Sequence, residues 1–441
     1  MPVTERKRPV RVQARWGWMM TGMTIDQAAE WIARTAGPGG RVHVGGCAGE
    51  PVALYDAFAR RPELAAGLTF FGVWIPGVNR CDWGALHPDA RAETIFASPD
   101  WTDGMDRGRT RVVPETYSTT WRRYEATGAD VSVLMIPPLR RPDRFCYGMA
   151  ADFGPATFFR APARLLLTNA AMPAAVGGLK DRVTADTAMA EADHPLTTLP
   201  AAPLDPAFTR IAGHVRGLLR DGDTIQFGLG KVQAAVIPTL TDLRDLRIHS
   251  GMISDPLLDL LGTPTLENAG GAVVTGVALC SGDAAYRTVA RSTTVTFAPV
   301  GHTHDIRTLA RINNLVAVNS VIEVDLFGQA NAEFLGGRAV SGGGGMLDFL
   351  RGANLSEGGR PIVALASTAK GGSLSRIVPR LADGAVTVPR ADMGIVVTEH
   401  GSADLRGLDG EARAMALIGI ADPAHRADLA DAWRRIRRAG S

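Results

Sequence analysis

The chain has 441 residues, 46% of them hydrophobic, a length and composition that predict two folded domains rather than one. Its 47 Lys and Arg residues nearly balance its 45 Asp and Glu residues. The net charge of +2 therefore gives no electrostatic reason to expect nucleic acid or an acidic membrane as a partner. No run of about 18 apolar residues occurs, and no apolar segment follows the basic N-terminus, so we expect neither a membrane span nor a secretion signal.

The first predicted elements are a helix, a strand and a second helix. Thr24 and Gln27 have the spacing of a capping box, and apolar residues then recur at helical intervals. Glycine-rich residues 37–40 end this helix. Residues 41–44 have the composition of a strand, and a glycine turn leads from them into a helical segment over 50–64. Strand, glycine turn and helix in this order are typical of half a βαβ unit.

Later apolar runs predict further strands of a parallel sheet. Residues 131–136 and 164–168 are short, almost wholly apolar and bounded by turn residues, which suits strands buried on both faces. The polar segment 181–203 then predicts a linker. We place the domain boundary there, which gives domains of 1–195 and 196–441.

The second half begins much as the first does. A helix is predicted over 206–219, a strand over 224–227, a glycine turn over 228–230, and a helix that continues to Leu240. The similar order of elements in the two halves indicates an internal structural duplication.

The C-terminus is predicted to be a helix that begins at Asp422-Pro423 and ends in a basic stretch. The arginines there are Arg434, Arg435, Arg437 and Arg438. A basic end has two interpretations, namely binding of RNA or a membrane, and complementing the helix C-terminus on a solvated face. The second is favoured because aromatic residues are not interleaved and the net charge is small.

Cysteine and histidine spacing argues against a metal site. The four cysteines lie far apart and form no C-x-x-C pair: Cys47, Cys81, Cys146 and Cys280. No histidine spacing is typical of zinc ligands. We therefore expect reduced thiols, no metal and a cytoplasmic location.

Two glycine-rich segments are candidates for binding an anion. Phe227-Gly228-Leu229-Gly230 follows a predicted strand and opens a helix, where backbone N–H groups hold a phosphate or a developing oxyanion. It lacks the third glycine and the later acidic residue of a dinucleotide site, which disfavours NAD. The second segment is Gly342 to Gly345. Its glycines indicate close approach of a ligand, a tight turn or, alternatively, a flexible loop.

Several segments, in their order and spacing, resemble the C-terminal signature of acetyl-CoA hydrolases and 4-hydroxybutyrate-type CoA-transferases. They are 319–329, 344–353, 367–372, 375–379 and 397–407. The resemblance extends upstream through 221–230 and, more loosely, through 130–138 and 169–173. It implies an α/β fold of two similar CoA-transferase-like domains, each with a mostly parallel sheet flanked by helices. It also implies an active site at their interface, coenzyme A bound mainly by the C-terminal domain, and a homodimer or larger homo-oligomer.

The resemblance also reveals a departure from the family at the catalytic nucleophile. In the transferases a glutamate attacks the acyl-CoA, giving an acyl-glutamyl anhydride and then a glutamyl-CoA thioester. That glutamate lies in a stretch resembling His-Thr-Glu-Met-x-Ser-Asp, and the matching residues here are 249–255, His-Ser-Gly-Met-Ile-Ser-Asp. Gly251 stands at the nucleophile position. Glycine has no side chain to acylate, so this mechanism does not carry over through residue 251.

Other family roles match residues that are present. The backbone N–H of Gly345, with Gly344, matches the oxyanion hole for the thioester. Gly228 and Gly230 match the turn that shapes the acyl pocket. Lys370, followed by Gly371 and Gly372, falls in a segment that contacts coenzyme A and would meet a phosphate, although a solvated loop lysine is the alternative.

Four sets of residues are candidates to replace the glutamate. His302 and His304 lie in a loop that the resemblance places near coenzyme A. A histidine there is a candidate general base, and the alternative is a loop that is simply capped by Asp305. Glu50 follows the first strand. It is either an acid or base at the site or the residue that begins a helix. His249 and Asp255 flank Gly251, where they orient substrate or end a strand. Cys280 is a conceivable thiol nucleophile, but buried packing is favoured.

These observations lead to three hypotheses. The first is an enzyme that hydrolyses acyl-CoA or passes the acyl group directly to a small carboxylate or other small acceptor. The second is a CoA-transferase whose nucleophile has moved to Glu50 or Glu333. The third is a protein that binds acyl-CoA without converting it. Four aromatic residues of the first half either line a substrate pocket or form core: Phe70, Phe71, Trp74 and Trp83.

Overall fold

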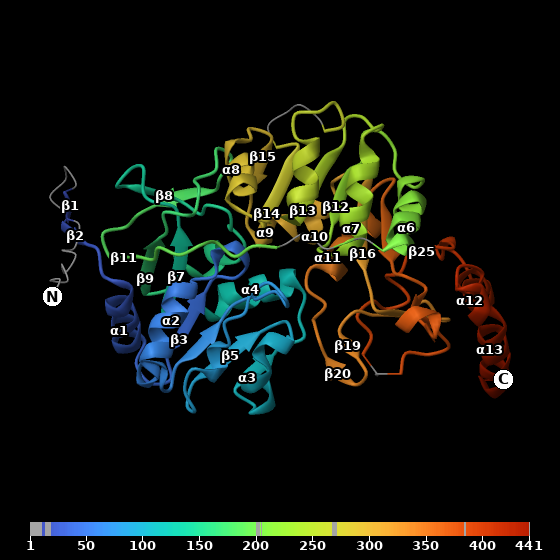
Figure 1. Ribbon diagram of the computed structural model, residues 1–441, viewed down its shortest axis with the longest axis horizontal. Helices are drawn as coiled ribbons and strands as arrows, with labels where there is room; N and C mark the ends of the chain where they lie inside the picture. The colour runs from blue at the N-terminus through green and yellow to red at the C-terminus, as the bar shows by residue number, and fades with distance from the viewer. Residues whose placement is uncertain are drawn as a thin grey trace, which may run out of the picture.

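The computed structural model describes residues 11–13, 19–199, 203, 205–266, 271–382 and 385–440. The basic N-terminal leader, apart from residues 11–13, and residues 200–202 of the predicted linker lie outside the described residues. Two large β-sheets lie side by side, the one from the first half of the chain on the left of Figure 1 and the one from the second half on the right. In these described ranges, no helix combines the length and apolar character that spanning a membrane requires.

The first sheet has seven strands, all parallel, in the order β11-β9-β7-β3-β4-β5-β6. Its strands are β3 (Arg41–Val44), β4 (Thr69–Phe71), β5 (Arg91–Thr94), β6 (Thr110–Val112), β7 (Val131–Ile136), β9 (Ala163–Thr168) and β11 (Thr187–Glu191). Every residue of β7 is buried, as predicted for a strand covered on both faces. The chain runs from β3 to β6 in one direction and then returns to place β7 on the other side of β3.

The second sheet repeats this winding with eight strands, in the order β15-β14-β13-β12-β16-β21-β25-β26. Its strands are β12 (Thr224–Phe227), β13 (Arg247–Ile253), β14 (Val273–Ala278), β15 (Val295–Phe297), β16 (Leu315–Ser320), β21 (Arg360–Ala364), β25 (Ile395–Thr398) and β26 (Gly401–Asp404). Only the pairing of β25 with β26 is antiparallel. The shared winding fits the duplication predicted from the sequence, and the predicted α/β fold with mostly parallel sheets is confirmed.

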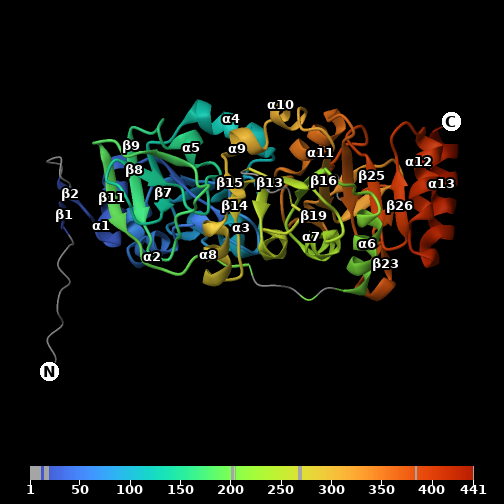
Figure 2. The same ribbon diagram turned by 90° about the horizontal axis from the view of Figure 1, so that it is seen from above.

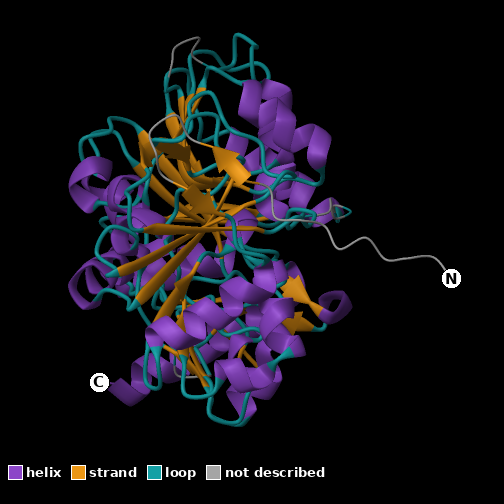
Figure 3. Ribbon diagram, turned by 90° about the vertical axis from the view of Figure 1, so that its left-hand side faces the viewer, coloured by secondary structure: helices purple, strands orange, loops and turns teal. Residues whose placement is uncertain are grey.

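Helices cover both faces of the strand layer (Figure 3). The longer ones are α1 (Ile25–Ala36), α2 (Val52–Arg60), α4 (Tyr117–Thr127), α6 (Pro206–Arg216), α8 (Asp283–Arg291), α11 (Met346–Leu355), α12 (Gly410–Gly419) and α13 (Arg426–Gly440). The predicted capping box is present, because Thr24 and Gln27 each bond the other's backbone N–H. Helix α13 lies beside α12 at one end of the molecule (Figure 2), where Trp433 and Arg437 both bond Glu411.

Hydrogen bonds join the two halves of the chain at several places, among them one loop and the start of one helix. Ala150 forms a bridge with Val277 of β14, and the Ala151 N–H donates to the Gly276 carbonyl at 3.0 Å. At the start of α4, the Ser118 hydroxyl donates to Asp348 of α11 at 2.6 Å. The loop before residue 153 and helix α4, both from the first half of the chain, therefore contact the second half directly. The predicted boundary at 195/196 falls between β11 and α6 and stays a prediction.

The four aromatic residues that had two interpretations belong to the core. Phe70, Phe71, Trp74 and Trp83 are each exposed by 1% or less. Phe70 and Trp74 pack against Trp83, with 4.9 Å between the ring centroids of Phe70 and Trp83, and Phe71 packs against Tyr124. None of them lines the large cavity described below.

Candidate active site

A cavity of ≈ 990 Å³ lies between the two halves. Its walls include residues that follow β3 and β12, the strands at which the winding of each sheet reverses direction. Ligands of open α/β sheets bind outside the carboxyl ends of strands at such reversal points. Here the two reversal points face one cavity, which makes it the candidate active site.

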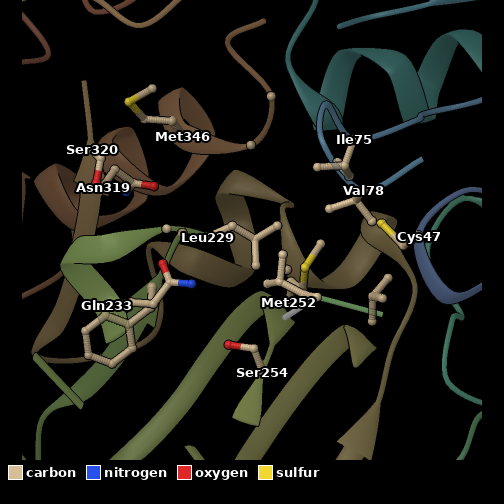
Figure 4. A pocket seen from close by; sticks show the side chains of 18 of the residues that line it. Cys47, Ile75, Val78, Leu229, Gln233, Met252, Ser254, Asn319, Ser320 and Met346 are labelled. Atoms are coloured by element: carbon tan, nitrogen blue, oxygen red, sulfur yellow. The ribbon is translucent and has the colours of Figure 1, made fainter. Parts of the chain in front are cut away.

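One part of the cavity is apolar. The side chains of Ile75, Val78, Leu229 and Met252 gather there, with Cys47 beside Val78 (Figure 4). The first two come from the loop after β4, and the others from the loop after β12 and from β13. Such a surface suits an apolar chemical group better than a charged one.

Opposite this apolar part, two buried amides close the cavity floor. The Asn319 side chain donates to the Gln226 oxygen at 2.8 Å and accepts from the Gln226 nitrogen at 3.3 Å. A Cβ atom on the neighbouring Gly228 would lie 3.3 Å from the Asn319 oxygen. The predicted glycine turn therefore lies directly against this amide pair, and both Gly228 and Gly230 line the cavity.

Gly251 lies on β13, and the imidazole ring of His304 occupies the space beside it. A Cβ atom on Gly251 would lie 2.6 Å from Cε1 and 2.9 Å from Nε2 of His304. Contacts this short do not occur at real Cβ atoms, so any side chain at 251 requires the ring to move. The imidazole of His304 thus fills the volume into which a residue at position 251 would project.

His304 is held in place by its neighbours and is electrically neutral. It is 2% exposed and packs between the rings of Tyr117 and Phe349, each with a centroid 4.7 Å away. We assign the Thr303 hydroxyl as donor to the Pro299 carbonyl, 3.4 Å away, and as acceptor from Nδ1–H, 2.9 Å away. This assignment leaves Nε2 with its lone pair beside Gly251. Burial lowers the pKa of His304 to about 3.

The glycine segment 342–345 packs tightly against both halves. A Cβ atom on Gly342 would overlap the Ile95 carbonyl, and one on Gly345 would overlap Nε2 of His304. One on Gly344, whose φ is +55°, would lie 2.9 Å from Cζ of Phe96. Close approach, rather than loop flexibility, therefore explains these glycines.

The same segment presents free backbone donors at the start of α11. The Gly344 carbonyl accepts from the Tyr117 N–H at 3.2 Å, whereas the N–H groups of Gly344 and Gly345 have no acceptor within the described part of the chain. Free N–H groups at a helix N-terminus stabilise a negatively charged oxygen. They have the chemistry that the predicted oxyanion hole requires.

Two cavity residues, Asp152 and Cys47, were missed by sequence reasoning. Both adopt positive φ, with values of 35° and 51°. Asp152 is 8% exposed, and burial raises its pKa to about 7. Burial, together with the charges of Asp152 and Glu50, raises the pKa of the Cys47 thiol. The glycines on both sides of Cys47 were a signal, whereas the sequence around Asp152 offered none.

The structure brings together only some of the predicted site residues. Those that line the cavity are Gly228, Gly230, Gly251, His304, Gly344 and Gly345. Those that do not are Glu50, His302, Glu333, Lys370, Gly371 and Gly372.

Two of these outlying residues are Glu50, which is buried away from the cavity, and His302, which lies at the surface. The Oε1 atom of Glu50 has no hydrogen-bond partner among the described residues. Burial raises the pKa of Glu50, although Asn79 and Cys81 nearby act in the opposite direction. His302 is exposed, with its ring centroid 5.7 Å from that of His249.

The other four outlying residues lie beyond residue 330, in two places. The loop 370–372 is exposed, and the Gly372 carbonyl lies 2.9 Å from Nε2 of His425. The Glu333 carboxylate accepts from the Thr387 hydroxyl at 2.8 Å.

The remaining candidates are the two residues that flank Gly251 and the cysteine considered as a nucleophile. His249 is buried, with Nε2 3.1 Å from the Thr303 carbonyl, and burial lowers its pKa to about 4. Asp255 lies on the cavity wall, where its carboxylate accepts from the backbone N–H of Ser281 at 3.0 Å. Cys280 is fully buried, and burial raises the pKa of its thiol, in agreement with the packing interpretation.

Comparison with known proteins connects this geometry to a family. Residues 282–433 match the family described as "Acetyl-CoA hydrolase/transferase C-terminal domain". The chain is 32% identical to 4-hydroxybutyrate coenzyme A transferase of Clostridium kluyveri over 397 residues, covering 88% of this chain and 92% of that protein. It is 31% identical to acetyl-CoA hydrolase of Neurospora crassa over 248 residues, covering 52% of this chain and 45% of that protein.

Solved structures agree with the sequence comparison. RipA from Yersinia pestis superposes with a TM-score of 0.86 at 28% identity, covering 94% of this chain and 97% of that structure. The identity and coverage of the Clostridium kluyveri enzyme extend the match well beyond the C-terminal segment. The chain therefore belongs to the acetyl-CoA hydrolase/transferase family.

Proposed function

We propose that this protein hydrolyses an acyl-CoA thioester, or passes its acyl group directly to a small acceptor, without a glutamyl intermediate. Relatives bear the names of CoA-transferases and acetyl-CoA hydrolases, and the chain is an enzyme of this acyl-CoA hydrolase or transferase type. The observation that carries the proposal is the position of His304, whose ring fills the space beside Gly251. A glutamate nucleophile at 251 has no room there.

The free N–H groups of the glycine segment hold the thioester oxygen in this proposal. When the carbonyl carbon is attacked, negative charge develops on that oxygen, and the N–H groups of Gly345 and Gly344 stabilise it. The acyl group then extends toward the apolar surface around Leu229 and Met252. Coenzyme A leads away over the second half, where the exposed Lys370 supplies a positive charge for a phosphate.

His304 acts on the attacking molecule in place of the missing carboxylate. Its Nε2 lone pair accepts a hydrogen bond from the O–H or N–H of water or another acceptor and so aligns the attacking atom. A covalent intermediate on the enzyme is not needed. After attack, the bond between the carbonyl carbon and sulfur breaks and the coenzyme A thiolate leaves.

The other two hypotheses are less well supported by the geometry. A nucleophile must reach the thioester carbon, but neither Glu50 nor Glu333 lines the cavity. A protein that only binds acyl-CoA has no evident need for free N–H donors on residues that line the cavity beside His304. Trapping of a modified carboxylate by borohydride or hydroxylamine during turnover tests the relocated nucleophile.

The proposal is tested with the purified protein and a panel of acyl-CoA thioesters that differ in chain length and charge. Release of free coenzyme A thiol is measured with a chromogenic disulfide, and the acyl product is identified by mass spectrometry. We expect turnover of at least one thioester and its loss in His304→Ala. His214→Ala is the matched control, because His214 is exposed on α6 and does not line the cavity. No binding and no turnover across the panel would refute the proposal.

A further inference from the structure

Asp152 lies in the loop after β8 (Arg144–Cys146), where the chain contacts its second half. Its N–H donates to the Gly276 carbonyl at 3.3 Å, and its carbonyl accepts from the Val300 N–H at 3.0 Å. Val300 begins α9 (Val300–Thr303), the short helix directly before His304. Backbone bonds to two elements of the other half therefore fix the position of Asp152 on the cavity wall.

The Asp152 carboxyl is buried with few partners. It accepts a hydrogen bond from the backbone N–H of Phe153, and no side chain of the described residues bonds or pairs with it. The titratable groups that face it are the Cys47 thiol, from the turn after β3, and the Tyr117 phenol, from α4. Burial raises the pKa of both, so both are uncharged at neutral pH.

A carboxyl group that is 8% exposed and accepts one hydrogen bond has unused acceptor capacity. Further donors have to come from the cavity that it lines. Its strained backbone, with a φ of 35°, is a conformation that non-glycine residues keep mainly where the surrounding structure imposes it. The arrangement fits a ligand that donates a hydrogen bond to Asp152.

The other charged residues of the cavity restrict the charge of that ligand. They are Lys231, Asp255 and Asp259. Lys231 is exposed, with Nζ 5.6 Å from the centre of the Phe208 ring, and it is the only cation among the described lining residues. A carboxylate acceptor beside Asp152 would be desolvated next to a like charge without a buried cation to pair with. A neutral molecule avoids this cost.

We infer that Asp152 is a catalytic acid–base residue that binds a neutral acyl acceptor carrying an O–H group, with water as the simplest case. This inference rests on the proposed function and narrows its acceptor. The acceptor oxygen attacks the thioester carbon, and its proton passes to the Asp152 carboxylate. The bond between carbon and sulfur then breaks, and the leaving thiolate takes the proton back from Asp152. The products are a carboxylic acid, or an ester, and coenzyme A.

Asp152 and His304 divide the work on the acceptor. His304, with a pKa of about 3, aligns the acceptor but holds a proton poorly at neutral pH. Asp152, with a pKa of about 7, is matched to the pH at which a proton has to be taken up and returned. The base must be deprotonated to act, so activity should fall as the pH drops below about 7.

The test compares kcat/KM between pH 5 and 9 for the wild type, Asp152→Asn and Asp428→Asn, using the best thioester of the panel. Asp428→Asn is the matched control, since Asp428 is exposed on α13 and does not line the cavity. We expect Asp152→Asn to lose about 100-fold or more, and the pH dependence near 7, as is typical of a general base. The control should stay within about twofold of the wild type, well below that general-base effect.

A second arm tests the charge of the acceptor. Methanol, a neutral acceptor, should yield the methyl ester, whereas acetate should yield no acetyl-CoA. Full activity of Asp152→Asn, a flat wild-type pH profile, or rapid acetyl-CoA formation from acetate would each overturn the inference. Because the profile and the acetate test use wild-type protein, they decide even if a variant fails to fold. Absence of any wild-type turnover would instead overturn the proposed function on which it rests.

Discussion

The contact between position 251 and the His304 ring leads to a quantitative prediction about folding stability. In Gly251→Ala, the new Cβ would lie 2.6 Å from Cε1 of His304, and the buried ring cannot rotate freely between Tyr117 and Phe349. Inserting a methyl group into a packed site costs about 1–3 kcal/mol. The free energy of unfolding of Gly251→Ala should fall by this amount.

Removing the ring should abolish that cost. In a His304→Ala background the alanine at 251 meets no imidazole, and replacing glycine in a strand then stabilises by about 0.5–1 kcal/mol. The coupling between the two substitutions should therefore be about 1.5–4 kcal/mol. Denaturant unfolding of the wild type, both single variants and the double variant measures it.

A glycine on the surface supplies the control for this cycle. A Cβ atom on Gly213 in α6 would meet no atom within 4 Å, so Gly213→Ala should show no coupling to His304→Ala. Additive effects of Gly251→Ala and His304→Ala, within about 0.5 kcal/mol, would refute the claim that the ring occupies the space beside residue 251.

Three further predictions concern the glycine segment, coenzyme A and pH. Gly345→Ala should destabilise the fold and abolish turnover, because its Cβ would overlap Nε2 of His304, and thermal unfolding with activity assays checks both. Lys370→Ala should raise KM for acyl-CoA and leave kcat nearly unchanged, as steady-state kinetics will show. Lys180→Ala is the control, because Lys180 is also exposed. Equal KM values for the wild type and Lys370→Ala would contradict a phosphate contact. Asp152→Asn should be more stable than the wild type above pH 7, by up to about 4 kcal/mol, and equally stable near pH 4. The sign follows because the raised pKa of Asp152 makes its charged form costly only in the folded state, so wild-type stability falls as pH rises from about 4 to 7. Urea unfolding of both proteins near pH 4 and above pH 7 measures the stability difference. The same difference at both pH values would contradict an effect of burial on the charged Asp152.

The strands that carry the fold were predictable because they are buried on both faces. Residues 131–136 form β7 without any shift of boundary, and residues 224–227 form β12. The glycine turns after β3 and β12 were also recognisable. Their meaning depends on the strand order of each sheet, however, and that order is set by contacts between residues far apart in the chain.

The predicted site was partly assembled and partly dispersed. The resemblance placed His302 and His304 in one loop, but only the structure separates them: His304 faces Gly251, and His302 faces solvent. Asp152 was missed because neither its φ nor its burial leaves a trace in the local sequence. Glu50 follows β3 as expected, yet its side chain turns toward Asn79 instead of the cavity.

The central claim is that acyl transfer proceeds without a covalent intermediate between the enzyme and either the acyl group or coenzyme A. It is tested most directly by mass spectrometry of the intact protein, quenched during steady-state turnover with and without borohydride or hydroxylamine. We predict an unmodified protein mass while free coenzyme A accumulates. A coenzyme A or acyl adduct, or a reduced or hydroxamate-modified glutamate such as Glu50 or Glu333 in the peptide map, would contradict the account.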